Sequence, residues 1–119
     1  FRLQKNLRRR LRKICKSKSD TTMGLIHCSS NHLRQYLERQ FQPGMSWNNY
    51  GTKWEVDHMM PCSSFNLEKK EEQYKCYHFT NMQPLSKTDN LRKGNRIVHD
   101  MKWNGTQWLI KKNGNYCLR

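Results

Sequence analysis

Residues 53–60 read Lys-Trp-Glu-Val-Asp-His-Met-Met, and a proline follows them. The run alternates with a period of two, so Trp54, Val56 and His58 share one face while Asp57 lies on the other. Proline cannot donate to a sheet ladder, and we therefore expect the strand to end before it. The sequence predicts a strand over residues 53–60, near the end of which an aspartate and a histidine point to opposite faces.

Two downstream segments complete a unit with this strand. Residues 81–85 read Asn-Met-Gln-Pro-Leu and are expected to form a short extended piece. Residues 86–89, Ser-Lys-Thr-Asp, form a capping box that predicts a helix over about 87–93, and Gly94 would end it. Strand, second strand and helix would then bring together four polar side chains: Asp57, His58, Asn81 and Asn90.

These motifs resemble those of the HNH endonucleases, in the homing type found in phages and large DNA viruses. The resemblance rests on Trp-Glu-Val-Asp-His-Met-Met-Pro-Cys at 54–62, Cys-Tyr-His-Phe-Thr-Asn-Met-Gln-Pro-Leu at 76–85 and Asn-Leu-Arg-Lys-Gly-Asn at 90–95. It extends upstream to cover about residues 25–95. The last position of the HNH signature is Asn90 here rather than histidine, a variant that occurs within the family.

The resemblance implies a ββα-metal fold and a role for each residue of the set. His58 would be the general base that takes a proton from water, and Asn81 would tie the following loop to the strand that holds this histidine. Asp57 and Asn90 would ligate one divalent ion, Mg²⁺ or Mn²⁺, through hard oxygen atoms. The implied activity is hydrolysis of DNA phosphodiester bonds by a one-metal mechanism, leaving a 5′-phosphate and a 3′-hydroxyl.

The charge of the chain indicates a polyanionic partner. Lys and Arg number 23 against 9 Asp and Glu, which gives a formal net charge of +14 over 119 residues. A small domain so basic repels itself unless it meets a polyanion, so nucleic acid is the expected partner and an anionic membrane surface the second choice. The resemblance to HNH endonucleases implies that this nucleic acid is double-stranded DNA. Apolar residues at steps of three and four within 1–18 predict a basic amphipathic helix. The expected DNA contacts are Arg8, Arg9, Arg10, Arg12, Lys13, Arg92, Lys93 and Arg96.

Two questions about function stay open at this point. The competing hypothesis is a non-catalytic, basic nucleic-acid-binding protein on a nuclease-like scaffold. A single site cuts one strand per docking, so a double-strand cut would need a homodimer or two successive nicks. No run approaches the roughly 18 to 20 apolar residues of a membrane span, so no membrane partner is expected. An intracellular location is expected, in the host cytoplasm or nucleus for a viral protein.

The five cysteines show no paired Cys-x-x-Cys motif. Reduced, partly buried thiols are the expected state, and no structural zinc is expected. A zinc site drawn from Cys62, Cys76 and His78 is the alternative, although its spacing matches no strong ligand signature.

The expected architecture is one α+β domain with four segments. Residues 1–20 form a basic helical DNA-binding arm, 21–53 a helical support with a helix at about 30–41, and 54–95 the ββα-metal nuclease core. Residues 96–119 form a small C-terminal β extension. Its hairpin turns are predicted at the two Asn-Gly pairs, 104–105 and 113–114, which favour type I′ turns.

Overall fold

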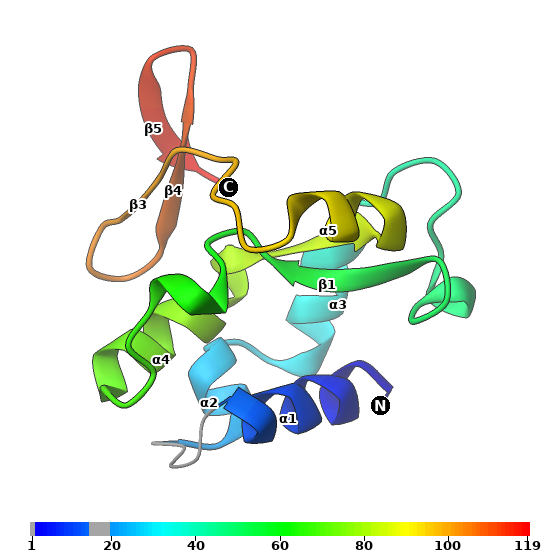
Figure 1. Ribbon diagram of the computed structural model, residues 1–119, viewed down its shortest axis with the longest axis horizontal. Helices are drawn as coiled ribbons and strands as arrows, with labels where there is room; N and C mark the ends of the chain where they lie inside the picture. The colour runs from blue at the N-terminus through cyan, green and yellow to red at the C-terminus, as the bar shows by residue number, and fades with distance from the viewer. Residues whose placement is uncertain (1, 15–19) are drawn as a thin grey trace.

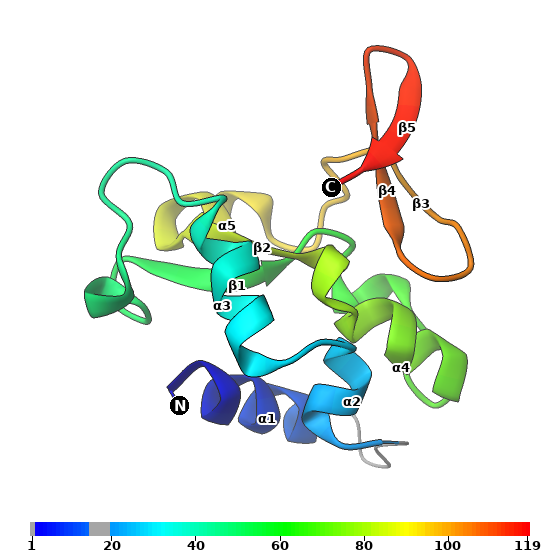
Figure 2. The same cartoon turned by 180° about the vertical axis from the view of Figure 1, so that it is seen from behind.

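The computed structural model describes residues 2–14 and 20–119, and gives side chains for all of these except 11–14. Within this part the chain is an α+β fold of helices and two small antiparallel sheets (Figure 1), as the sequence predicted. One sheet lies near the middle of the molecule, and the other stands at one end beside the C-terminus (Figure 2). No helix in the described ranges has the length and apolar character needed to cross a bilayer.

The central sheet is a pair of short strands followed directly by a helix. Strand β1 (Trp54–His58) runs antiparallel to β2 (Met82–Ser86), with Trp54 opposite Ser86 and His58 opposite Met82. Helix α5 (Lys87–Lys93) packs against both strands. The Ser86 hydroxyl accepts a hydrogen bond from the backbone N–H of Asp89 at 3.1 Å, so the predicted cap and helix are confirmed.

The N-terminal helices pack beneath this sheet and form the core with it. Helix α1 (Arg2–Ile14) buries Leu3 and Leu7, which join Trp54 and Val56 in one cluster. Residues 2–14 of the basic segment therefore form a packed helix, and removing this helix would open the core. The rest of the described helical elements are α2 (Thr22–Ile26), α3 (Ser30–Glu38), α4 (Lys70–Tyr77) and the 3₁₀ turns η1 (Trp47–Asn49), η2 (Cys62–Ser64) and η3 (Phe79–Asn81).

Two helix predictions differ from the structure. In the segment 21–53, where the sequence placed one helix at about 30–41, the structure has a further short helix, α2, which begins at Thr22, and the Thr21 hydroxyl caps the backbone N–H of Gly24. A helix of five residues is too short to show a hydrophobic period. Helix α3 is capped by the Ser29 hydroxyl and ends at Glu38 rather than near residue 41.

The C-terminal sheet is a three-stranded meander of β3 (Met101–Trp103), β4 (Trp108–Lys112) and β5 (Asn115–Leu118). Asn113 and Gly114 both have positive φ, at 52° and 83°, as a type I′ turn requires. The prediction for the other pair was wrong. There Gly105 alone has positive φ, and the side chain of Asn104 accepts hydrogen bonds from two backbone N–H groups of a wider loop.

Candidate functional site

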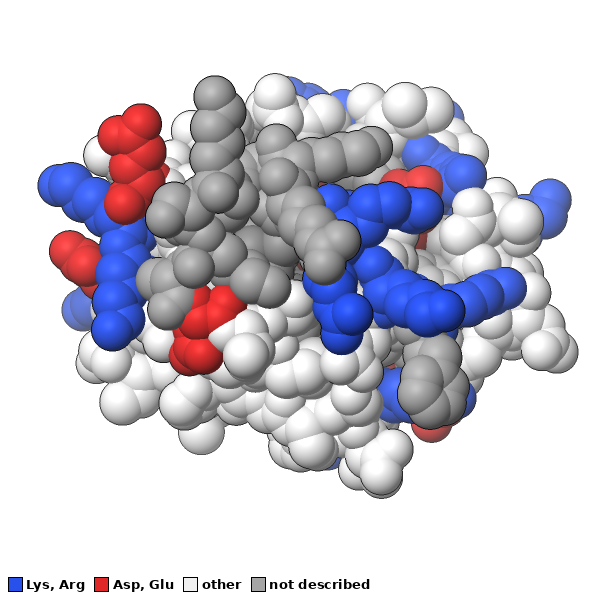
Figure 3. Space-filling view, turned by 90° about the horizontal axis from the view of Figure 1, so that it is seen from below, with Lys and Arg blue, Asp and Glu red and all other residues white. Residues whose placement is uncertain are grey.

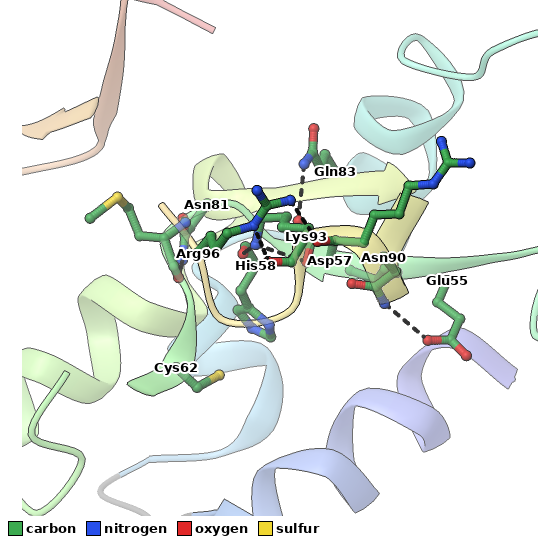
Figure 4. Close-up of polar contacts among 12 residues, drawn as sticks. Glu55, Asp57, His58, Cys62, Asn81, Gln83, Asn90, Lys93 and Arg96 are labelled. Atoms are coloured by element: carbon green, nitrogen blue, oxygen red, sulfur yellow. Dashed lines mark hydrogen bonds and ion pairs between the residues drawn. The ribbon is translucent and has the colours of Figure 1, made fainter. Parts of the chain in front are cut away.

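Asp57 lies on the face of β1 that α5 covers, and it is held by two side chains. Only 6% of the residue is exposed. The Lys93 ammonium lies 3.3 Å from its Oδ1, and the Gln83 side-chain amide donates to its Oδ2 at 2.9 Å (Figure 4). Lys93 also donates to the backbone carbonyl of His58 at 3.0 Å. The end of β1 is thereby tied to the last turn of α5.

Glu55 and Asn90 add oxygen atoms on the same face. The Asn90 side chain donates to Glu55 Oε2 at 3.3 Å, so its own carbonyl oxygen is not used in this contact. Glu55 and Asp57 are two residues apart on a strand and therefore share a face. Carboxylate and amide oxygens are the donors that Mg²⁺ prefers, so these residues offer the types of ligand that such an ion takes. Glu55 was missed as a site residue, although strand alternation already placed it beside Asp57.

His58 lies on the opposite face of β1, against α1 and α4. The residue is 4% exposed, and its ring meets that of Tyr77 edge-on with 4.7 Å between centroids. Arg10 donates to the carbonyl of Val56 at 2.7 Å and brings Nη2 within 3.4 Å of His58 Nδ1. A guanidinium can only donate, so this contact assigns Nδ1 as the acceptor nitrogen and places the proton on Nε2.

Two sulfur atoms complete the surroundings of His58. Cys62, in η2, and Cys76, in α4, have their Sγ atoms 3.5 Å apart. One ligand atom from each of His58, Cys62 and Cys76 lies within 4.8 Å of the others. A hydrogen bond from Cys76 lowers the pKa of Cys62, and one from His58 adds to this effect, while burial opposes it. The thiolate form of Cys62 is favoured by these neighbours.

The third member of the zinc alternative from the sequence, His78, lies outside this cluster. Its Nδ1 accepts from the backbone N–H of Thr80 at 3.2 Å, and its ring stacks on those of His27 and Phe79. Burial, together with the positive charge that His27 can carry, lowers the pKa of His78 from 6.5 to about 4. His78 is therefore a buried structural residue.

Asn81 joins the loop after β1 to the end of α4. Its side-chain nitrogen donates to the carbonyls of Met60, at 3.0 Å, and Cys76, at 2.9 Å. Its side-chain oxygen accepts from the backbone N–H of Met60 at 2.8 Å. The residue is fully buried. Asn81 thus holds the segments that carry His58 and Cys76 together without pointing at either side chain.

A groove lined with cations runs between α1 and the edge of this site. Its volume is about 840 Å³. Lys and Arg side chains gather on the face of the molecule seen from the α1 side (Figure 3). Glu55 and Lys87 line the groove from the β1 and α5 side. The lining residues from α1 are Arg2, Lys5, Asn6, Arg9 and Arg10.

The remaining predicted DNA contacts are distributed over three settings. Arg8, Arg92 and Arg96 are exposed, and the guanidinium of Arg96 donates to the last carbonyls of α5. The side chains of Arg12 and Lys13 lie outside the described residues. The predicted DNA contact of Lys93 requires a correction. The residue is 5% exposed, and its side chain pairs with Asp57 instead of facing solvent.

The comparisons with known proteins find viral relatives. The chain is 39% identical over 102 residues to uncharacterized protein L426 of Acanthamoeba polyphaga mimivirus, covering 84% of this chain and 45% of the relative. It is 38% identical over 104 residues to uncharacterized protein L246 of the same virus, covering 86% and 46%. The chain thus spans about half the length of these curated relatives. No protein-family model matches the sequence, and no solved structure matches it.

Proposed function

We propose that this protein is a metal-dependent DNA endonuclease of the HNH type, with β1, β2 and α5 as a ββα-metal core. The observation that carries the proposal is the placement of Asp57, His58 and Asn90 on one strand pair and the helix that follows it, beside a cation-lined groove. An acid–base group, oxygen ligands and a phosphate-binding surface are the parts that phosphodiester hydrolysis needs.

Asp57 and Asn90 would hold the divalent ion on the α5 side. Lys93 and Gln83 each contact one oxygen of Asp57, and a carboxylate has lone pairs left for a further cation. Mg²⁺ or Mn²⁺ there would supply charge stabilisation for the phosphate and the leaving oxygen. Lys93 would orient the carboxylate, and its ammonium would compete with the ion for Oδ1.

His58 would act as the general base through Nδ1. This nitrogen accepts in the neutral ring, and Arg10 closes it off from solvent. Arg10 also lines the groove, where a DNA phosphate would offer its guanidinium a charged partner in place of a carbonyl and an imidazole. Transfer of Arg10 to the phosphate would open Nδ1 to the attacking water, so DNA binding and activation of the base would be coupled.

A non-catalytic DNA-binding protein is the second candidate. The burial of Asp57 and His58 favours it, since 6% and 4% of these residues are exposed and Lys93 closes the metal-binding face. On this alternative the ion pair and the Arg10 contact are structural, and the groove binds DNA without turnover.

Cleavage of a supercoiled plasmid separates the two candidates. We expect open circles with Mg²⁺ or Mn²⁺ and none with EDTA, and direct linear product would indicate a homodimer. Asn90→Ala should need more Mg²⁺ for the same rate, because an oxygen ligand is lost. Asn95→Ala, an exposed position just after α5, is the matched control and should cleave normally. Stable DNA binding without cleavage in either metal would overturn the proposal in favour of the second candidate.

A further inference from the structure

The proposed hydrolysis uses one nitrogen of His58 and neither of the sulfur atoms beside it. We propose that His58, Cys62 and Cys76 form a second metal site, selective for a soft divalent ion such as Zn²⁺. A metal ion bound there would prevent His58 from acting as the general base. The existence of the site is independent of the proposed function, whereas the inhibition rests on it.

The spacing of the three residues fits a zinc centre. Tetrahedral Zn²⁺ with Zn–S bonds of about 2.3 Å separates two ligand sulfurs by roughly 3.7 Å. The Cys62 and Cys76 sulfurs lie 3.5 Å apart, and all three ligand atoms lie within 4.8 Å of one another. Small side-chain adjustments would therefore complete the site. Three protein ligands leave the fourth position to water or another donor.

The position of the His58 ring supports the same ligand. Nε2 of His58 is buried and has no nitrogen or oxygen partner, while Nδ1 faces Arg10, which leaves Nε2 for the contact between His58 and the Cys62 sulfur. Buried polar atoms are almost always paired, and a metal bound to both Nε2 and the Cys62 sulfur would give this nitrogen a stronger partner. The imidazole of His58 and the sulfur of Cys62 lie on the same side of β1, away from Asp57 (Figure 4).

The chemistry of the donors decides which ion enters. Two thiolates balance the charge of one divalent ion, so Zn²⁺ would give a neutral centre in a buried site. Sulfur and imidazole select zinc-like ions, whereas the oxygen donors of Glu55, Asp57 and Asn90 suit Mg²⁺. The two faces of β1 would thus discriminate between two classes of metal.

Zinc at Nε2 would block the base without touching Nδ1. A neutral imidazole has one acceptor nitrogen and one N–H, so a metal on Nε2 forces the proton onto Nδ1. Nδ1 can then no longer take a proton from water, and it loses its contact with Arg10. Magnesium could remain at Asp57 while catalysis stops.

Metal binding by the full chain in a reducing buffer tests the site. We expect one Co²⁺ per chain with a thiolate-to-cobalt charge-transfer band, and displacement of Co²⁺ by Zn²⁺. Cys62→Ser should weaken Zn²⁺ binding by at least about 10- to 100-fold, the loss seen when even an outer-shell partner is removed. Cys28→Ser is the matched control, since Cys28 is a partly buried cysteine outside the cluster. Equal Zn²⁺ affinity in Cys62→Ser and the control would overturn the site.

Alkylation of the unmodified protein covers the case in which Cys62→Ser folds poorly. Zn²⁺ should slow modification of Cys62 and Cys76, located by mass spectrometry, and leave Cys28 unaffected. Protection of none of the three, or equal protection of all, would overturn the site.

Cleavage in Mg²⁺ with and without one equivalent of Zn²⁺ tests the inhibition. The cleavage rate with Zn²⁺ should be at least about 10-fold lower than the rate without Zn²⁺ for the wild type and for Cys28→Ser. For Cys62→Ser the two rates should be nearly equal. Inhibition of Cys62→Ser to the same extent would place the inhibitory zinc elsewhere and overturn the mechanism. Zinc binding without any Mg²⁺-dependent cleavage would overturn the proposed function and leave the site standing.

Discussion

The two faces of β1 differ sharply in chemistry although Asp57 and His58 are neighbours in sequence. On the α5 side, Asp57 is surrounded by oxygen and nitrogen groups that pair its charge, with Lys93 at 3.3 Å. On the α1 and α4 side, His58 meets a guanidinium, an aromatic ring and two sulfurs. Two adjacent residues of one strand therefore lie in different environments, an ionic one around Asp57 and one rich in sulfur and aromatic groups around His58. The reason is that adjacent side chains of a strand point to opposite faces.

The largest effect on stability is expected on the ionic face. Asp57→Ala leaves the Lys93 ammonium buried without its counter-charge, so the free energy of unfolding should fall by about 3–5 kcal/mol. Urea denaturation followed by tryptophan fluorescence measures the change. The double variant Asp57→Ala/Lys93→Met should recover most of the loss, since it removes the stranded charge. A single variant as stable as the wild type would show that the pair is not closed in solution.

A buried histidine next to Tyr77 should make the fold sensitive to acid. His78 follows Tyr77, which packs on His58, and its pKa is lowered from 6.5 to about 4. The unfolded chain therefore binds a proton that the folded chain refuses, and stability should fall from about pH 6.5 down to pH 4 and be unaffected by this group above that range. The loss should reach about 3 kcal/mol at pH 4.

Urea midpoints at several pH values measure this dependence in the wild type and in His78→Gln, which should show a flatter profile. His32→Gln is the control, because His32 is an exposed histidine. An equally steep profile in His78→Gln would assign the acid sensitivity to other groups.

The smallest expected effect is on DNA binding by the groove, which is lined by residues of α1 on one side and of β1 and α5 on the other. Lys5 and Arg9 line it, whereas Arg8 is exposed on α1 and does not. Lys5→Gln/Arg9→Gln should weaken binding to duplex DNA by about 10-fold and flatten the salt dependence of log K by roughly 2, since each lost phosphate contact removes about 0.9. Fluorescence anisotropy at several salt concentrations measures both. Arg8→Gln should cost less, and an equal cost would contradict the groove as the DNA path.

Sequence alone predicted the local features of this site well. The period of two in the strand predicted that the side chains of Asp57 and His58 lie on opposite faces, and Ser86 predicted the start of α5. The inward turn of Lys93 was also within reach, because it lies three residues after Asn90 and so shares its helix face.

The contacts made by distant segments were not predictable in this way. Arg10 reaches His58 across 48 residues, and Cys76 meets Cys62 only because α4 packs beside the loop after β1. The hydrophobic period of a single segment does not predict contacts between distant segments, because these contacts depend on how the helices pack. For the same reason the zinc alternative from the sequence combined Cys62 and Cys76 with His78, whereas the structure brings His58 to these two cysteines.

The proposed roles of the two faces of β1, metal binding by Asp57 and proton transfer by His58, are tested most directly by comparing the wild type, Asp57→Asn and His58→Ala. Mn²⁺ binding, duplex DNA affinity and Mg²⁺-dependent cleavage should be measured on the same preparations. We predict that Asp57→Asn loses metal binding and cleavage together. His58→Ala should keep its metal and DNA affinities while its cleavage rate falls about 10²- to 10⁴-fold, the contribution of a general base. Cleavage by His58→Ala at the wild-type rate would contradict the assignment of this histidine and the role proposed for its face of β1.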